Sequence, residues 1–124
     1  MKYGIKWIAN NAILSFEGDI TFDDLDQANN EIYGDPRLDL MKYTIFDFRG
    51  AESIDINYDE MKVISTLDKG ISKWNRNLKI AIIVDDNNSN NKEKVLNYIQ
   101  LMEDNDWKIG YFIELEKAVE WCLE

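Results

Sequence analysis

The stretch that decides the fold is LKIAIIV, residues 78–84, in which every position except Lys79 is apolar. A strand with one face in solvent alternates apolar and polar residues, whereas a strand covered on both faces is apolar throughout. Seven residues suit a strand better than a helix, and isoleucine and valine favour extended backbone. We therefore expect a central strand of a covered sheet, with neighbours that run parallel to it.

The segments around this strand alternate between strand and helix patterns. Residues 43–48 (YTIFDF) and 109–113 (IGYFI) are rich in β-branched and aromatic residues, and residues 3–17 form two alternating stretches typical of a hairpin. Apolar residues recur at helical spacing in four stripes: Phe22, Leu25, Ala28 and Ile32; Val63, Ile64, Leu67, Ile71 and Trp74; Val95, Tyr98, Ile99 and Met102; Leu115, Ala118, Val119 and Cys122. The pattern predicts one α/β domain, residues 1–124, in which an N-terminal β-hairpin is followed by βαβαβα crossovers in a mixed, mostly parallel sheet.

Local signals place the ends of these elements. Asn10-Asn11 separates the two hairpin stretches and predicts the turn, because asparagine tolerates a positive φ. Thr21 and Asn57 each precede an acidic residue by three positions, which predicts N-caps for the first and second helices. Gly34 is expected to end the first helix in the left-handed conformation, and Pro36 blocks its continuation.

The composition excludes several classes of function. The chain has 124 residues, a formal net charge of −10, no histidine and one cysteine, Cys122. Without histidine there is no Ser-His-Asp or Cys-His nucleophile and no imidazole metal ligand, so we expect no enzyme, no catalytic or metal site and no cofactor. The negative charge disfavours nucleic acid and anionic membrane surfaces as partners. The single cysteine and the lack of a long apolar run predict a cytoplasmic protein without membrane insertion.

Short motifs accompany the predicted order of elements. They are Gly18-Asp19-Ile20-Thr21 before the first helix, Asp35-Pro36-Arg37 after it, Asp47-Phe48-Arg49 before the second helix, and Tyr111-Phe112-Ile113 with an Ala-containing, Trp-ended helix at the end. Together these features resemble the STAS fold, named for sulfate transporters and anti-sigma-factor antagonists, and particularly its small stand-alone bacterial members. The resemblance covers nearly the whole chain and implies a STAS-like, non-enzymatic regulatory module that binds a protein partner.

The same resemblance indicates where a partner would bind. In anti-sigma-factor antagonists a serine within Asp-Ser-Ser-Gly, at the start of the second helix, is phosphorylated by a partner kinase. Alignment on Asp47-Phe48-Arg49 places Asp55-Ile56-Asn57-Tyr58 over that motif, and asparagine has no hydroxyl to phosphorylate. The resemblance therefore implies a partner-contact surface without the usual phosphoserine. Its candidate residues are Ser53, Asp55, Asn57 and Tyr58; Ser53 is either a displaced phosphoacceptor or an ordinary loop serine.

Acidic and basic clusters allow other interpretations. Asp47, Asp85 and Asp86 follow predicted strands and could together hold Mg²⁺, although aspartate is also common in turns. A basic cluster at the end of the second helix could bind an acidic surface or simply complement the helix dipole. This cluster contains Lys69, Lys73 and Arg76.

A second class of function is a small-ligand carrier that holds a lipid or a nucleotide beneath a helix. The four tryptophans could line such a pocket, but they are also typical of cores and interfaces. They are Trp7, Trp74, Trp107 and Trp121. The carrier thus remains an alternative to the regulatory module, and either is compatible with a homodimer.

Overall fold

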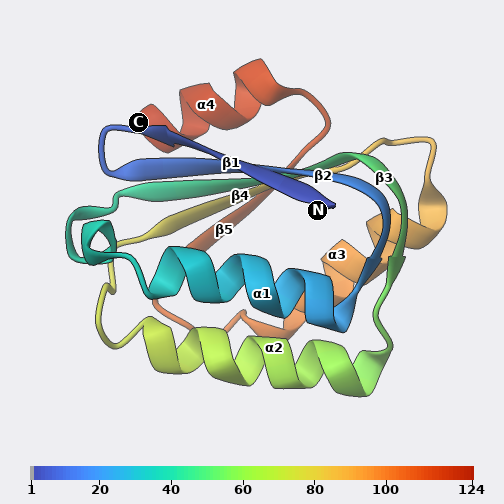
Figure 1. Cartoon of the computed structure of the whole chain (residues 1–124), viewed down its shortest axis with the longest axis horizontal. Coiled ribbons are helices and arrows are strands. Elements are labelled where there is room, and N and C mark those ends of the chain that lie inside the picture. The colour runs from blue at the N-terminus through green and yellow to red at the C-terminus, as the bar shows by residue number, and fades with distance from the viewer. Residues whose placement is uncertain (1) are drawn as a thin grey trace.

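The computed structural model describes residues 2–124, which form a five-stranded sheet with four α-helices and one short 3-10 helix, η1 (Figure 1). Along the chain the elements are β1 (Tyr3–Ile8), β2 (Asn11–Thr21), α1 (Phe22–Tyr33), η1 (Pro36–Leu40), β3 (Tyr43–Asp55), α2 (Tyr58–Ile71), β4 (Lys79–Ile83), α3 (Ser89–Leu101), β5 (Lys108–Phe112) and α4 (Leu115–Leu123). The strand order is β1-β2-β3-β4-β5, with β1 antiparallel to β2 and the other neighbours parallel. The predicted mixed, mostly parallel sheet is confirmed.

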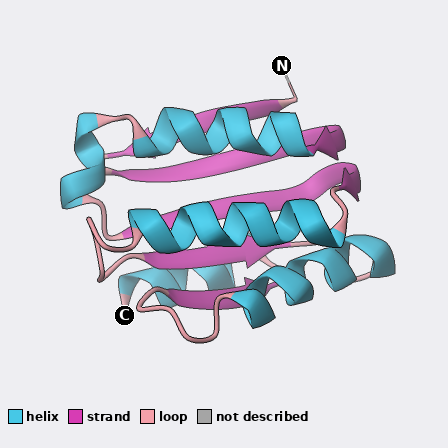
Figure 2. Cartoon of the chain, turned by 90° about the horizontal axis from the view of Figure 1, so that it is seen from below, coloured by secondary structure: helices cyan, strands magenta, loops and turns pink. Residues whose placement is uncertain are grey.

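Helices cover both faces of the sheet. Helices α1, α2 and α3 lie on one face, and α4 lies on the other (Figures 1 and 2). Strand β4 explains this arrangement, because successive side chains point to opposite faces. Ile80 and Ile82 belong to the larger core beneath α1–α3, whereas Ala81 and Ile83 belong to the smaller core beneath α4. The prediction that residues 78–84 are covered on both sides is confirmed.

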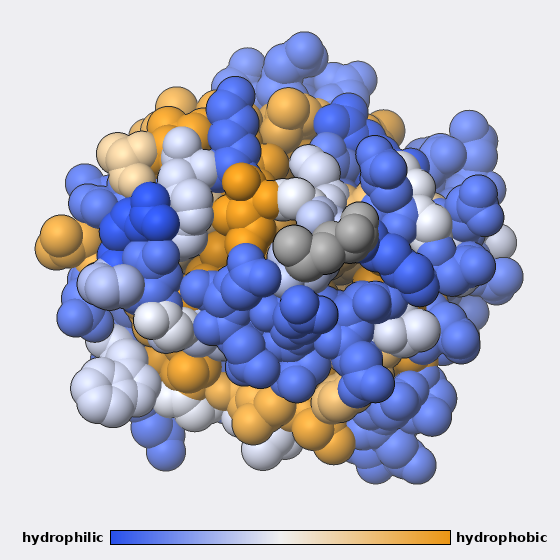
Figure 3. Space-filling model, viewed as in Figure 1, coloured by the Kyte–Doolittle hydropathy of each residue, from blue (hydrophilic) through white to orange (hydrophobic). Residues whose placement is uncertain are grey.

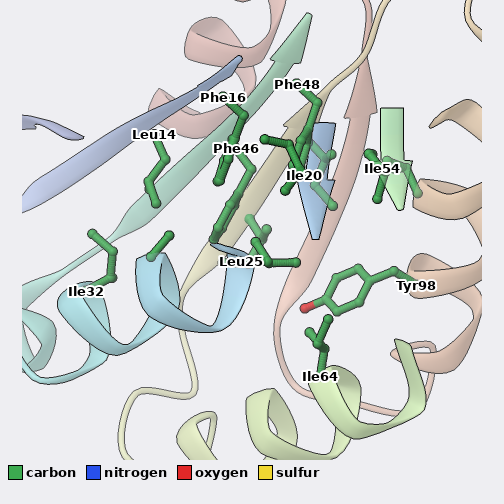
Figure 4. Close-up of a cluster of buried hydrophobic side chains, with 14 of the residues drawn as sticks. Leu14, Phe16, Ile20, Leu25, Ile32, Phe46, Phe48, Ile54, Ile64 and Tyr98 are labelled. Atoms are coloured by element: carbon green, nitrogen blue, oxygen red, sulfur yellow. The ribbon is translucent and has the colours of Figure 1, made fainter. Parts of the chain in front are cut away.

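A stack of aromatic rings lies within the larger, mostly aliphatic core. Phe16 of β2 stacks on Phe48 of β3, with ring centroids 4.4 Å apart, and Phe46 stacks beside them. Leu25 of α1 and Ile64 of α2 close over these rings from the helical layer (Figure 4). Each fully buried side chain of this size contributes roughly 1.5–3 kcal/mol, so this cluster is a main source of the stability of the fold.

Strands β2 and β3 are longer than the sequence pattern predicts. We expected β3 to end at Phe48, but pairing with β2 continues to Asp55 through two register shifts. Glycine makes this possible: Gly18 has a φ of 77°, and a Cβ on Gly50 would lie 2.7 Å from the carbonyl oxygen of Phe16. The sequence of residues 49–53 predicts a loop, yet pairing with β2 holds the backbone of this segment in the sheet.

Two predicted turns differ from the structure. The hairpin turn is Ala9-Asn10, with the positive φ at Ala9 (53°), whereas Asn11 already belongs to β2. The side chain of Asn11 accepts from the backbone N–H groups of Lys42 and Tyr43, which fixes the start of β3. Gly34 ends α1 in the right-handed region (φ −86°, ψ −3°), not in the left-handed conformation. The reason is that the next residue, Asp35, is already the N-cap of η1.

The predicted apolar stripe of α2 is partly wrong. Met61, Ile64, Ser65 and Asp68 are buried, whereas three residues of the predicted stripe lie in solvent. These three are Val63 (48% exposed), Leu67 (53%) and Trp74 (78%). The helix rotates to bury Asp68, whose hydroxyl partners come from α1 and α3. Figure 3 shows apolar surface over α2, at the bottom of the view.

Candidate partner-contact surface

The structure brings the four candidate residues together. Ser53 and Asp55 lie at the carboxyl end of β3, Asn57 is the N-cap of α2, and Tyr58 is the first residue of α2. Asp55, Asn57 and Tyr58 are exposed, and Ser53 is half-buried. They form a continuous strip where β3 passes into α2, which we call the β3–α2 junction.

Asn57 is committed to the helix backbone. Its Oδ1 accepts from the N–H of Glu60 at 2.8 Å, and Glu60 Oε1 accepts from the N–H of Asn57 at 3.0 Å. This reciprocal pair is the predicted capping box, and the equivalent pair of Thr21 and Asp24 opens α1. Position 57 therefore serves the fold through an amide oxygen and offers no phosphate acceptor.

Ser53 is also occupied. Its Oγ donates to Asp19 Oδ1 at 2.7 Å, so the hydroxyl bridges the ends of β2 and β3. Phosphorylation of Ser53 would place a dianion against this carboxylate, which like-charge repulsion disfavours. The contact favours the ordinary serine over the displaced phosphoacceptor.

Tyr58 supplies the junction with an exposed aromatic ring. Tyr58 is 53% exposed, and Lys62 Nζ lies 5.3 Å from the centroid of its ring. Lys62 also pairs with Asp59 at 3.4 Å. An aromatic ring buries a large area on binding and loses few rotamers, so exposed tyrosine is a common anchor of interfaces.

Two asparagines that sequence reasoning missed hold the junction in place. Asn91 of α3 is 1% exposed; its Oδ1 accepts from the Ile54 N–H at 2.8 Å and its Nδ2 donates to the Ala51 carbonyl at 3.1 Å. Asn88, the N-cap of α3, donates to the Glu52 carbonyl at 3.1 Å. β4 ends before this part of β3, so the two carboxamides take the place of a neighbouring strand. The only sequence signal for these two contacts is the asparagine-rich segment 85–91, whose composition predicts a polar turn.

A second missed residue, Asp68, lies inside the helical layer. It is 4% exposed and accepts from the hydroxyls of Tyr33 at 2.9 Å and Tyr98 at 2.5 Å. Burial raises the pKa of Asp68 to about 6, and the two hydroxyl donors partly offset this effect. Figure 4 shows Tyr98 reaching from α3 toward α2, beside Ile64. Asp68 thus ties α1, α2 and α3 together through one carboxylate.

The interior cavity beside Asp68 bears on the small-ligand alternative. It has a volume of about 50 Å³ and lies between the sheet and α1–α3, with Phe46, Phe48 and Tyr98 in its wall. A cavity that takes a single benzene ring measures about 150 Å³. The cavity is therefore too small for a nucleotide or a lipid chain in this conformation. None of the four tryptophans lines it.

The proposed magnesium ligands do not converge. Asp47 forms a bidentate pair with Arg49 (2.9 and 2.8 Å), Asp85 accepts from the backbone of Asn87, and Asp86 pairs with Lys92 at 3.4 Å. Within residues 2–124 no group of three acidic or cysteine side chains is placed to hold a metal. Each aspartate instead satisfies a local partner, as is common in turns.

Of the remaining sequence candidates, Lys69 and Cys122 have structural roles. Lys69 pairs with Asp104 at 3.1 Å, which lowers the pKa of that carboxyl, while Lys73 and Arg76 follow α2 in solvent. Cys122 is buried in the smaller core, and burial raises the pKa of its thiol to about 11. Within the same residues, none of the helices is long and apolar enough to cross a bilayer.

The solved structures that are similar to this chain include the following two. One is an uncharacterized protein of the DUF3478 family with a SpoIIAA-like fold, from Shewanella loihica PV-4, at a TM-score of 0.55 and 15% identity over 97% of this chain and 91% of that one. The other is a chain from the complex of diguanylate cyclase SiaD with its activator SiaC, from Pseudomonas aeruginosa, at a TM-score of 0.47 and 15% identity over 90% of this chain and 92% of that one. No protein-family model matches the sequence, and no curated protein matches it significantly. The first likeness confirms the predicted STAS-like architecture: the chain has a SpoIIAA-like fold.

Proposed function

We propose that this chain is a non-enzymatic regulatory module that binds a protein partner through the β3–α2 junction. The observation that carries the proposal is the exposed ring of Tyr58 on a helix terminus that is fixed by a complete capping box. A rigid, exposed aromatic anchor binds at low conformational cost. Asp55 adds an acidic rim to the same strip, which suits a basic patch on the partner.

We further propose that regulation at this surface does not use a phosphoserine at position 57. Asn57 offers no hydroxyl, and Ser53 is held against Asp19. A partner that relies on a phosphate charge to dissociate would have no switch here. The single, buried Cys122 is compatible with the reducing cytoplasm in which we place this interaction.

The test compares capture of partners by the wild-type chain and by the double variant Asp55→Ala/Tyr58→Ala. A protein from the host that binds the wild-type chain is identified, purified and titrated against both forms by calorimetry. The double variant should bind at least about tenfold more weakly, because truncation of an interface anchor costs about 1–2 kcal/mol or more. The control is Glu120→Ala on α4, on the other face of the sheet, which should leave the affinity unchanged.

Two outcomes would contradict the proposal. Equal affinity of wild-type and double variant would place the contact elsewhere on the chain. Stoichiometric phosphate on Ser53, mapped by mass spectrometry after incubation with host lysate and ATP, would show that the phosphoserine switch is retained at a displaced position.

A further inference from the structure

A groove of about 120 Å³ runs between α1 and α2, which lie side by side over the sheet (Figures 1 and 2). Leu67 and Ile71 form its α2 side, and Asp26 lies on its α1 side. Asn29, Ile64 and Asp68 line both this groove and the interior cavity, so they form the floor that separates the two. The groove is thus mostly apolar, with the amide of Asn29 and the carboxylate of Asp68 beside Ile64 at its base.

Three hydrogen-bond acceptors on the floor of the groove have room for a further donor. Asn29 is 8% exposed, and its Oδ1 has no hydrogen-bond partner. Each carboxylate oxygen of Asp68 accepts one tyrosine hydroxyl and can accept a second hydrogen bond. A buried polar atom without a partner is rare in folded proteins and calls for an explanation. A ligand that brings N–H donors to this floor would explain the unpartnered oxygen.

The charges around the floor are unbalanced. The titratable groups that face Asp68 are the hydroxyls of Tyr33 from α1 and Tyr98 from α3, while the sheet presents apolar side chains. Within residues 2–124, no lysine or arginine lies within ion-pair distance of Asp68, and none lines the groove. A cation with an apolar stem is the chemical complement of this site.

We propose that the groove between α1 and α2 receives an arginine side chain of the protein partner, with its guanidinium on Asn29 and Asp68 and its methylenes along Leu67 and Ile71. The guanidinium is a planar fork of donors, which matches two acceptors on one floor. The groove is somewhat smaller than a site for one benzene ring, so it admits one side-chain head and not a whole metabolite.

A protein is the source of this arginine because the apolar surface continues beyond the groove. Val63 lies in solvent on α2, one turn before Leu67, and Trp74 lies in solvent just after the end of α2. Both would be covered by the residues that flank the arginine. Free arginine would leave them exposed. This inference rests on the proposed function, since it presumes a protein partner, but it concerns a different part of α2 from the β3–α2 junction.

The experiment titrates the isotope-labelled full chain with N-acetyl-arginine-methylamide and records amide chemical shifts. Saturable shifts should be confined to α1 and α2 around Asn29 and Asp68. The isosteric, uncharged citrulline amide should produce none. Asp68→Asn, which keeps the shape of the side chain, should weaken binding at least about tenfold, and Asn29→Ala should weaken it severalfold.

The pH dependence gives a second measurement that does not depend on a variant. Binding requires the ionised carboxyl, so the affinity of the wild-type chain should fall about tenfold from about pH 7.5 to about pH 5, below the raised pKa of Asp68. The control, Asp86→Asn, removes one exposed acid far from the groove and should leave the affinity unchanged.

Three results would overturn the inference: no saturable shift, equal binding of the citrulline amide, or equal weakening by Asp68→Asn and Asp86→Asn. The last would show that the cation merely responds to the overall charge. The probe needs no partner protein, so failure here leaves the β3–α2 junction untouched. The test of the β3–α2 junction uses a host protein and not the arginine amide, so its outcome leaves the groove untouched.

Discussion

Replacement of Asn91 by alanine is expected to destabilise the fold and to loosen the candidate contact surface together. The carboxamide of Asn91 satisfies the Ile54 N–H and the Ala51 carbonyl, and both of these residues are buried. Alanine removes both bonds and leaves two backbone groups without partners. Each such group costs about 1–3 kcal/mol, so the pair should lower the free energy of unfolding by about 3 kcal/mol.

This loss is a large share of the 5–15 kcal/mol typical of a domain, and it should lower the Tm by about 10 °C. Urea titration followed by circular dichroism measures it as a lower midpoint. Hydrogen exchange adds a local measurement, because the Ile54 amide should become exposed to exchange at the end of β3. The matched control is Asn90→Ala: Asn90 is the neighbouring, exposed asparagine of the same helix and should change stability by less than about 0.5 kcal/mol.

A second variant separates the two hydrogen bonds. In Asn91→Asp the ionised carboxylate can still accept from Ile54 but cannot donate to Ala51, and it buries a charge; the protonated carboxyl can donate. Asn91→Asp should therefore lose stability as the pH rises through the pKa of the new carboxyl. If Asn91→Ala unfolds within about 0.5 kcal/mol of the wild-type chain, the carboxamide does not replace a strand neighbour and the account of the junction is wrong.

Three further predictions concern single positions. Asn57→Ala should cost about 1 kcal/mol through loss of the cap, whereas Asn57→Ser should be nearly neutral in thermal melts; unchanged stability of the alanine variant would refute the capping role. Ala9→Gly should raise the free energy of unfolding by about 0.5 kcal/mol, because glycine relieves the positive φ of the hairpin turn but loses more chain entropy; a clear loss would contradict this. Burial raises the pKa of Asp68 from 3.8 to about 6, so the folded chain holds this proton to a higher pH than the unfolded chain does. Its contribution to stability is therefore complete below about pH 4 and declines by about 3 kcal/mol as the pH rises to 6; denaturation midpoints of Asp68→Asn should lack that decline.

The architecture was predictable because each strand and helix carries its own burial pattern. Residues 78–84 have to be covered on two faces whatever their neighbours are, and α3 with its C-cap buries Val95, Tyr98 and Met102 as the spacing predicts. The caps were predictable for the same reason. Thr21 and Asn57 bond to backbone three residues away, so a short window of sequence contains both partners.

The errors occur where a side chain is satisfied from far along the chain. Asp68 is buried because Tyr33 and Tyr98 lie 35 and 30 residues away, and no local pattern contains that pairing. Hydropathy alone therefore turned α2 the wrong way and placed Leu67 in the core. Asn91 is a similar case, since its partners are 37 and 40 residues upstream. Both sites depend on tertiary contacts of polar groups, which periodicity does not encode.

The candidate surface was likewise predictable only in part. Alignment on Asp47-Phe48-Arg49 selected Ser53, Asp55, Asn57 and Tyr58, which are close neighbours in the sequence, and their contact with a partner stays a prediction. What the alignment could not supply is the extension of β3 to Asp55, which turns an expected loop into a strand. The groove between α1 and α2 was not predicted at all, because the polar residues of its floor, Asn29 and Asp68, interrupt apolar faces and hydropathy assigns them to solvent.

Helix α2 carries both proposed contacts, and its anchoring explains how they can act independently. Its first turn is fixed by the Asn57 cap, and its end is fixed where Ser72 Oγ accepts from Asn105 at 2.9 Å. Between these points, Asp68 binds it to both neighbouring helices. Tyr58 and Asp68 are ten residues apart, which is about 15 Å along a helix, and substitutions at that separation usually act additively. A helix held at both ends and in the middle changes little when one contact is lost, so the junction and the groove can recognise separate features of one partner.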